Sequence, residues 1–492
     1  PAWPATGDLD TSFSGDGKLL TDFGGREAIN AVARQSDGRI VAVGSMDGDF
    51  LVMRFTSAGA LDTTFDGDGF RLVNFGATDT AQAVVIQSDG RIVVAGTSSD
   101  FAVARLTSNG GLDATFGHGG LVTGDYGEAG AASANAVALD ALGRILVAGD
   151  SGAGNFGVAR LSTAGTLDVT FSGDGRLVKN FGGNDAAAGL ALRSDGAIVV
   201  AGTANGGSAS GNRSNLAVAV FNAGGIDTAF GAGAPNSPVT DLGGCADSAR
   251  TVLVQPDNRI LVGGGAGLNC LSGFPDSSPA LVRYNSNGTL DTTFSGDGIA
   301  VFGFGVGDGD AVASMALQPD GAIVAAGTTN LSSAATPHRS QFGVVRLRGT
   351  DGGVDLAFHG DGSQQTSFGA GEAALTAMLL QPTDGRIVAA GTFKTCDANG
   401  ALQSTDVALA RHHAITCNNL NATRIGTSGA DTLVGVSIVS RTGTLHVADV
   451  IHGMGGADVI DGLGANDSLC GGDGDDTLRG GTQPEAEYLL LA

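Results

Sequence analysis

The chain has 492 residues and a formal net charge of −24 at pH 7, which disfavours nucleic acid and anionic membranes as partners and favours inorganic cations. Hydrophobic residues make up 42% of it and 83 residues are glycine, so the sequence is too apolar for a disordered chain and rich in turns. No apolar run approaches the roughly 20 residues of a spanning helix, so we expect no membrane span.

One motif recurs from the N-terminus onward: Leu-Asp-x-x-Phe, or a close variant, which follows a short apolar run in all copies but the first. The copies are 51 to 64 residues apart, a period typical of repeat arrays and propellers. Between copies the order of segments is constant, as in KLLTDFG, INAVARQ, DGRIVAVG and FLVMRF. The anchor aspartates are Asp10, Asp62, Asp113, Asp168, Asp227, Asp291 and Asp355.

The segments between the anchors are short, rich in Val, Ile and Ala, and bounded by Asp-Gly or Asn-Gly turns. This pattern predicts antiparallel strands joined by tight hairpins. Four strands per unit and seven units predict an all-β fold, a seven-bladed β-propeller of four-stranded blades over residues 1–415.

The two ends of the repeat array predict how the ring closes. The first anchor, at residues 9–13, has no apolar strand before it, and the last strand, at residues 407–411, has no anchor after it. We therefore expect the N-terminal LDTSF to dock on the last blade and close the ring non-covalently. An open solenoid would need polar capping units, and none is visible.

Over about residues 7–415 the combined pattern G-x-LD-x-x-F, DG-x-I-x-V-x-G and V-x-R-L resembles the bacterial delta-60 repeats of secreted and surface proteins. Six of the seven last strands also contain an arginine. We interpret these as buried partners of the anchor aspartates, because a catalytic group is seldom copied around a ring. They are Arg54, Arg105, Arg160, Arg283, Arg346 and Arg411.

The texture changes after a linker at residues 416–425. GTSGADTLV, GMGGADVID, GLGANDSLC and GGDGDDTLR follow, and the last fits the nonapeptide G-G-x-G-x-D-x-U-x at every defined position. Gly426 and Gly453 are 27 residues apart, or three nonapeptides, so we read GVSIVSRTG and TLHVADVIH as units in phase. Six units predict a short parallel β-roll of three turns within residues 426–481.

This segment resembles the repeat-in-toxin proteins, whose roll binds calcium and folds outside the cell. Calcium takes six to eight oxygen ligands, which glycine-rich loops and aspartates supply. Two nonapeptides per turn would bring together Asp431 with Asp449, Asp449 with Asp467, and Asp458 with Asp476. The predicted calcium residues are Asp431, Asp449, Gly453, Gly455, Asp458, Gly462, Gly464, Asp467, Gly471, Asp473 and Asp476.

We interpret several weaker features as structural. The Asp66–Gly69 turn, the GDSG at residues 149–152 and the His412-His413 pair each favour a plain turn or strand end over a metal or nucleophile site. The tail at 482–492 resembles the acidic-then-apolar ending of type I secretion substrates. Cys245 and Cys270 are placed to form a disulfide at the open end of a hairpin, whereas the pairing of Cys396, Cys417 and Cys470 is left open.

Together these features predict a secreted calcium-binding structural or interaction protein, outside the cell or at its surface, with calcium ions and further copies of itself as partners. A glycan or protein at the cell surface is an alternative partner, which would make the chain an adhesion module. A propeller hydrolase or lyase with its site at the channel mouth is the other alternative. Few aromatics and loops rich in Gly, Ser and Ala favour the non-enzymatic reading.

Overall fold

The computed structural model describes the repeat array almost continuously and the C-terminal segment in short pieces. In the described part every regular element is a strand, so no helix there is long and apolar enough to cross a membrane. The described ranges are 7–205, 214–231, 238–243, 246–267, 277–305, 311–331, 339–381, 385–396 and 402–413, followed by short stretches between 416 and 490.

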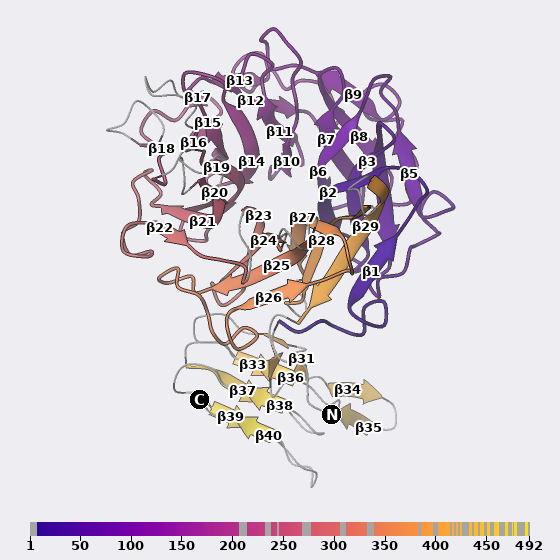
Figure 1. Cartoon of the computed structure of the whole chain (residues 1–492), viewed down its shortest axis with the longest axis vertical. Helices are drawn as coiled ribbons and strands as arrows, with labels where there is room; N and C mark the ends of the chain where they lie inside the picture. The colour runs from indigo at the N-terminus through magenta and orange to yellow at the C-terminus, as the bar shows by residue number, and fades with distance from the viewer. Residues whose placement is uncertain are drawn as a thin grey trace.

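Seven groups of antiparallel strands stand around a central axis like the blades of a propeller (Figure 1), which confirms the predicted fold. The first three blades are β2 (Glu27–Arg34), β3 (Ile40–Met46), β4 (Asp49–Phe55) and β5 (Phe70–Val73); β6 (Thr80–Ile86), β7 (Ile92–Thr97), β8 (Phe101–Leu106) and β9 (Leu121–Gly124); and β10 (Ala136–Leu139), β11 (Ile145–Asp150), β12 (Phe156–Leu161) and β13 (Arg176–Lys179).

The outer edge of the fourth blade is divided between two short strands, β17 and β18, which both pair with β16. The fourth and fifth blades are β14 (Ala186–Leu192), β15 (Ile198–Ala204), β16 (Asn215–Asn222), β17 (Gly225–Ile226) and β18 (Val239–Thr240); and β19 (Ser248–Val254), β20 (Ile260–Gly267), β21 (Ser277–Tyr284) and β22 (Ile299–Val301).

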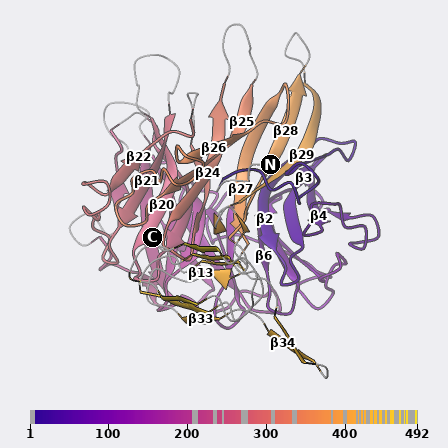
Figure 2. The ribbon, with the colours of Figure 1, turned by 90° about the horizontal axis from the view of Figure 1, so that it is seen from below.

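The sixth and seventh blades share an apolar core, and a single parallel bridge, Ser340 with Glu372, joins them into one sheet. Their longest strands, β28 and β29, have 10 and 11 residues and rise above the shorter blades on one side of the ring (Figure 2). The strands are β23 (Val312–Leu317), β24 (Ile323–Asn330), β25 (Ser340–Leu347) and β26 (Ser363–Thr366); and β27 (Glu372–Leu380), β28 (Ile387–Cys396), β29 (Leu402–His412) and β1 (Lys18–Thr21).

The N-terminal segment closes the ring, as predicted, and contributes more than its anchor. Strand β1 pairs antiparallel with β29, from Lys18 opposite Ala410 to Thr21 opposite Val407, and is the fourth strand of the last blade. The anchor itself bridges the same strand, Leu9 opposite His412. Each unit read from the sequence is therefore offset from a blade, because its first strand completes the blade before it.

A glycine explains how the inner strands pack. In the first blade the inner strand β2 has a β-bulge between Ile29 and Ala31, and Gly44 of β3 lies opposite it. A Cβ added to Gly44 would lie 1.7 Å from the Ala28 carbonyl oxygen, so only glycine fits. A Cβ added to the last glycine of DG-x-I-x-V-x-G would lie 1.8 to 2.2 Å from a carbonyl oxygen in or just before the inner strand in all the other blades, at Gly96, Gly149, Gly202, Gly264, Gly327 and Gly391.

The C-terminal segment forms two parallel sheets, the predicted roll (Figure 1). Buried Ile451, Ile460 and Leu469 form its core, and Leu433 and Leu478 pack against them. One sheet is β32 (Arg424–Ile425), β36 (Val450–His452), β38 (Ser468–Cys470) and β40 (Tyr488–Leu490), and the other is β33 (Thr432–Val434), β37 (Val459–Asp461) and β39 (Thr477–Arg479). The hairpin β30 (Thr416–Cys417) and β31 (Leu420–Asn421) precedes them.

One part of the sequence reading is wrong. The unit GVSIVSRTG is not a coil of the roll, because β34 (Ser437–Ser440) and β35 (Gly443–His446) pair antiparallel as a separate hairpin. The next coil therefore begins late: Thr432 of β33 pairs with Val459 of β37, 27 residues on, where a regular turn takes 18. The hairpin is an insertion about as long as one nonapeptide, so the spacing of the later units did not reveal it.

Candidate functional site: calcium repeats and inter-blade clamps

The regular part of the roll has the spacing that calcium-binding nonapeptides require. Val450 pairs with Ser468, and Val459 pairs with Thr477, so each sheet advances 18 residues per turn. The middle residue of each strand faces the core, as buried Ile451, Ile460 and Leu469 show. The polar, glycine-rich parts of the nonapeptides consequently fall in the connections between strands.

Asp458 is the predicted calcium residue that lies within the described part. It stands directly before β37 and is 1% exposed, and its backbone carbonyl accepts a hydrogen bond of 2.7 Å from the amide of Thr477. A carboxylate buried in a segment this rich in aspartate fits a hard cation such as calcium. The other predicted ligands lie outside the described residues: Asp431, Asp449, Gly453, Gly455, Gly462, Gly464, Asp467, Gly471, Asp473 and Asp476.

The hairpin insertion changes which units stack. Because β33 pairs with β37, the nonapeptide that ends at Val434 lies beside the one that ends at Asp461. The strand register therefore does not support the expected pairing of Asp431 with Asp449. Among the described His, Cys, Asp and Glu side chains, no three converge as a metal centre.

The propeller arginines form clamps between blades. In the first blade Arg54 donates from Nε to Asp62 Oδ2 at 2.8 Å and from Nη2 to Thr64 Oγ1 at 2.9 Å. Its Nη1 reaches the Ser108 carbonyl of the next blade at 2.5 Å, and its guanidinium lies 5.0 Å from the centre of the Phe65 ring. The predicted pairing with the anchor aspartate holds for all six arginines.

A second arginine supports the same aspartate in five blades. Arg91, from the turn before β7, lies 2.9 Å from Asp113 Oδ2, which also accepts from Arg105. Burial alone would raise the pKa of Asp113, but the hydrogen bonds from Thr115 and the charge of Arg105 outweigh it and lower the pKa to about 2. These arginine and aspartate charges therefore stabilise the packing of the blades.

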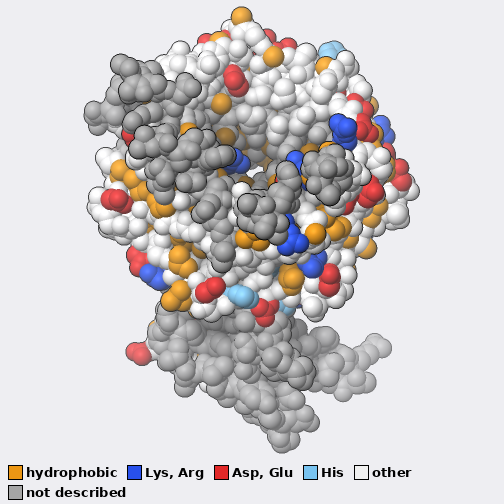
Figure 3. All heavy atoms as spheres, in the orientation of Figure 1, with side chains coloured by type: hydrophobic (Ala, Val, Ile, Leu, Met, Phe, Trp, Pro, Cys, Tyr) orange, Lys and Arg blue, Asp and Glu red, His pale blue; other side chains and the backbone are white. Residues whose placement is uncertain are grey.

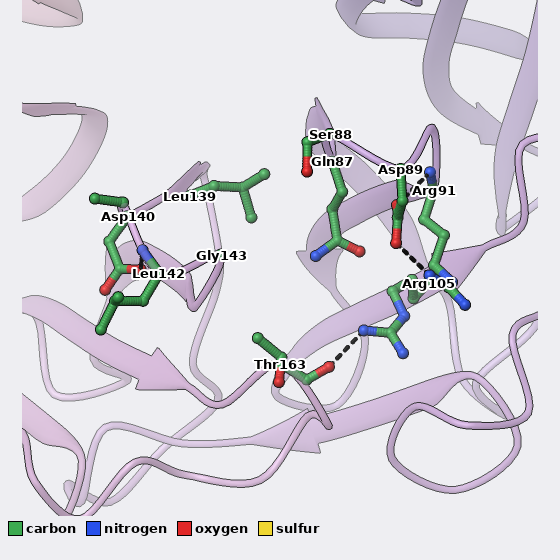
Figure 4. Close-up of a pocket in the computed structure, with 11 residues that line it drawn as sticks. Gln87, Ser88, Asp89, Arg91, Arg105, Leu139, Asp140, Leu142, Gly143 and Thr163 are labelled. Atoms are coloured by element: carbon green, nitrogen blue, oxygen red, sulfur yellow. Dashed lines mark hydrogen bonds and ion pairs between the residues drawn. The ribbon is translucent and has the colours of Figure 1, made fainter.

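A pocket of about 520 Å³ opens between the second and third blades (Figure 4). Gln87 and Arg91 line one side, and Asp140 and Leu142 line the other. Arg105, which also lines the pocket, donates to Thr163, Thr115 and Asp113. The residues that line this pocket include no His, Cys, Glu or Tyr, so they offer no acid–base pair beyond the aspartates already paired with arginine.

The weaker sequence candidates are structural where the structure describes them. Asp66 pairs with Arg71 at 3.0 Å and Asp68 accepts from the Phe70 amide, so that turn is a plain one. Ser151 is fully buried and donates to Glu128, out of reach of a substrate.

Both His412 and His413 are buried where the ring closes, with 0% and 4% exposure. Cys396 is a half-buried free thiol. The proposed partners Cys245 and Cys270, and the side chains of Cys417 and Cys470, lie outside the described residues.

Charge on the propeller surface gives no further site on the face seen in Figure 3. Acidic and basic side chains are both scattered over the part of that face drawn in colour, and they gather into no large patch of one sign.

Fold and repeats together define a β-propeller that continues into a calcium-binding repeat segment. Residues 448–478 match the family model described as RTX calcium-binding nonapeptide repeat (4 copies). Residues 35–65, 87–116, 143–171 and 255–294 match the one described as domain of unknown function (DUF5122) beta-propeller. Both resemblances predicted from the sequence are confirmed. The search of curated proteins gives no significant match.

Solved structures with similar folds are propellers of several kinds. Virginiamycin B lyase from Staphylococcus aureus is 10% identical with a TM-score of 0.44, over 80% of this chain and 98% of the lyase. XC5397 from Xanthomonas campestris, described as a gluconolactonase, is 14% identical with a TM-score of 0.36, over 66% of this chain and 94% of that one. At these identities and scores the likeness assigns no activity to this chain.

Proposed function

We propose that this protein is a secreted calcium-binding structural or interaction protein, in which the propeller is a scaffold and calcium folds the roll. The observation that carries the proposal is the regular 18-residue register of two parallel sheets within the segment that matches the calcium-binding repeat. Extracellular calcium is abundant enough to load weak sites, and extracellular modules bind it with Kd values of about 10⁻⁴–10⁻³ M.

Calcium would act on folding because the roll has little else to stabilise it. Its described core is three buried aliphatic residues, far fewer than any blade interface contains. The nonapeptide aspartates repel one another without a cation, so binding free energy becomes folding free energy. We assign Asp458 and Asp476, which precede the paired strands β37 and β39, to one calcium site.

Self-association through the ends of the roll is the second part of the proposal. In the described part β39 pairs only with β37, and β40 pairs only with β38. Each of these strands offers one edge of backbone donors and acceptors to another chain. A second copy that stacks on these edges would extend both parallel sheets.

Light scattering in millimolar calcium, and again after chelation, tests both parts together with far-UV circular dichroism. We expect strand signal to rise with calcium, and mass to rise with it if the roll ends associate. Asp458→Asn with Asp476→Asn should raise the calcium concentration at the midpoint by tenfold or more. Asp195→Asn on an exposed propeller turn is the matched control and should change nothing. Full strand signal under chelation would contradict the proposal that calcium folds the roll. A mass that does not change with calcium would contradict the proposal that copies associate.

A further inference from the structure

Three of the seven histidines lie at the seam where the N-terminal segment, residues 7–21, docks on the last blade. His412 ends β29 and His413 follows it directly. His359 lies in the turn before β26, 3.3 Å from Asp8 between Nε2 and Oδ1. His412 bridges Leu9 as Phe55 bridges Leu61 in the first blade. The other blades also have an apolar or aromatic residue there: Leu106, Leu161, Phe221, Tyr284 and Leu347.

The imidazole of His412 joins three pieces of chain. Its Nδ1 lies 3.0 Å from the carbonyl oxygen of Gly7, and its Nε2 lies 3.3 Å from the Thr366 hydroxyl at the end of β26. A carbonyl only accepts, so we assign the proton to Nδ1, and the Thr366 hydroxyl then donates to Nε2. A second proton on Nε2 would remove that acceptor and place a charge in a site with 0% exposure.

The charged groups around this ring come from every neighbouring element. Asp8 lies on the N-terminal segment, His359 on the turn before β26, and His413 directly after β29. Lys18 of β1 donates to the Ser367 carbonyl beside Thr366. Arg411 and Arg386 pair with Asp10 next to the seam. Burial is the main cause that lowers the pKa of His412 to about 4, and the positive charges of His413 and His359 add to it.

We propose that His412 is an acid-sensitive latch, whose protonation releases the N-terminal segment from the last blade and opens the ring. The closed seam binds the imidazole in its neutral form, whereas the open one leaves it free to ionise. Because the pKa is lower in the closed state than the usual value near 6.5, the open state binds more protons below that pH. Closure is therefore fully stable above about pH 6.5 and weakens as the pH falls towards 4.

Hydrogen exchange read by mass spectrometry tests the latch on the full chain. Peptides that cover residues 7–21 are compared with the reference strand β9 at pH 7 and pH 4.5, with calcium constant and intrinsic exchange rates corrected. In the wild type the opening equilibrium of the N-terminal segment should rise about 60-fold from pH 7 to pH 4.5. His412→Phe, which places the residue of the first blade at the seam, should abolish most of this rise.

His359→Gln and His413→Thr keep the latch ring and should retain most of the rise. An undiminished rise in His412→Phe, or no rise in the wild type, would overturn the proposal. If His412→Phe leaves residues 18–21 unprotected at pH 7, the titration of the His412 ring by NMR in the wild type decides. A ring that stays neutral to near pH 4 supports the latch, and one that titrates near pH 6.5 refutes it.

Discussion

Single arginines connect neighbouring blades where one guanidinium pairs with its own anchor aspartate and also reaches a carbonyl of the next blade. Four of them do so: Arg54, Arg105, Arg283 and Arg411. Arg283 is 1% exposed and donates to Asp291, Thr293 and two carbonyls of the sixth blade. Its Lys variant would keep the charge but lose the fork geometry that serves all these acceptors. The repeat is thus held by directional bonds as well as by apolar burial.

Removing one clamp should therefore be costly. Arg105→Met leaves Asp113 buried beside one exposed arginine, and we expect a loss of about 3–5 kcal/mol in the free energy of unfolding. Arg71→Met at the exposed pair with Asp66 is the control and should cost less than about 1 kcal/mol. Urea unfolding of both variants gives the comparison, and equal losses would show that burial of the pair is irrelevant.

Acid should weaken the clamps in a defined direction. The pKa of Asp113 is lowered to about 2, so its clamp contributes stability above the unfolded value near 3.9 that is lost as the pH falls from about 4 to 2. Asp113→Asn should flatten the stability profile in this range. A variant that loses as much stability between pH 4 and pH 2 as the wild type would contradict the assignment.

The glycine opposite each bulge makes a second residue-scale prediction. Gly44→Ala puts a methyl group into a backbone carbonyl and should destabilise the blade by about 1–3 kcal/mol or more. Gly111→Ala, whose added carbon would meet only the Thr107 hydroxyl at 3.6 Å, is the matched control. Thermal unfolding of the two variants checks the difference, and equal midpoints would refute the steric account.

At the scale of elements, the closing strand β1 is joined to the last blade only by non-covalent contacts, because it comes from the other end of the repeat array. Deletion of residues 1–21 removes β1 and Asp10, which leaves the last blade with three strands and the buried Arg411 without its anchor aspartate. We expect a lower unfolding midpoint that a synthetic peptide of residues 7–21 restores. A deletion that leaves the midpoint unchanged would show that closure contributes nothing.

Counting repeats predicted the blades, the closure and the arginine pairs, because each depends on a pattern copied several times. The sequence did not predict the hairpin β34–β35. Its length of one nonapeptide kept the later units in phase, and its antiparallel pairing left no mark in the repeat pattern. The role of His412 was not predicted because a change in a single copy of the repeat produces no periodic pattern. Alignment of the seven strands against one another, with histidine in the place of Phe55, is the signal that would have found it.

At the scale of the whole molecule, a rigid ring of clamped blades carries a segment whose core is small and whose loops are acidic. The two parts should therefore differ in what stabilises them, the ring by its own packing and the roll by calcium. We therefore expect calcium to change the folding of the roll and to leave the propeller as it was.

Hydrogen exchange with and without calcium, compared peptide by peptide at pH 7, tests that claim most directly. We expect strong calcium-dependent protection in residues 448–478 and unchanged protection in the blade strands β3, β7, β11 and β20. Equal protection of residues 448–478 in both conditions would contradict the claim, as would a loss of protection throughout the propeller when calcium is removed.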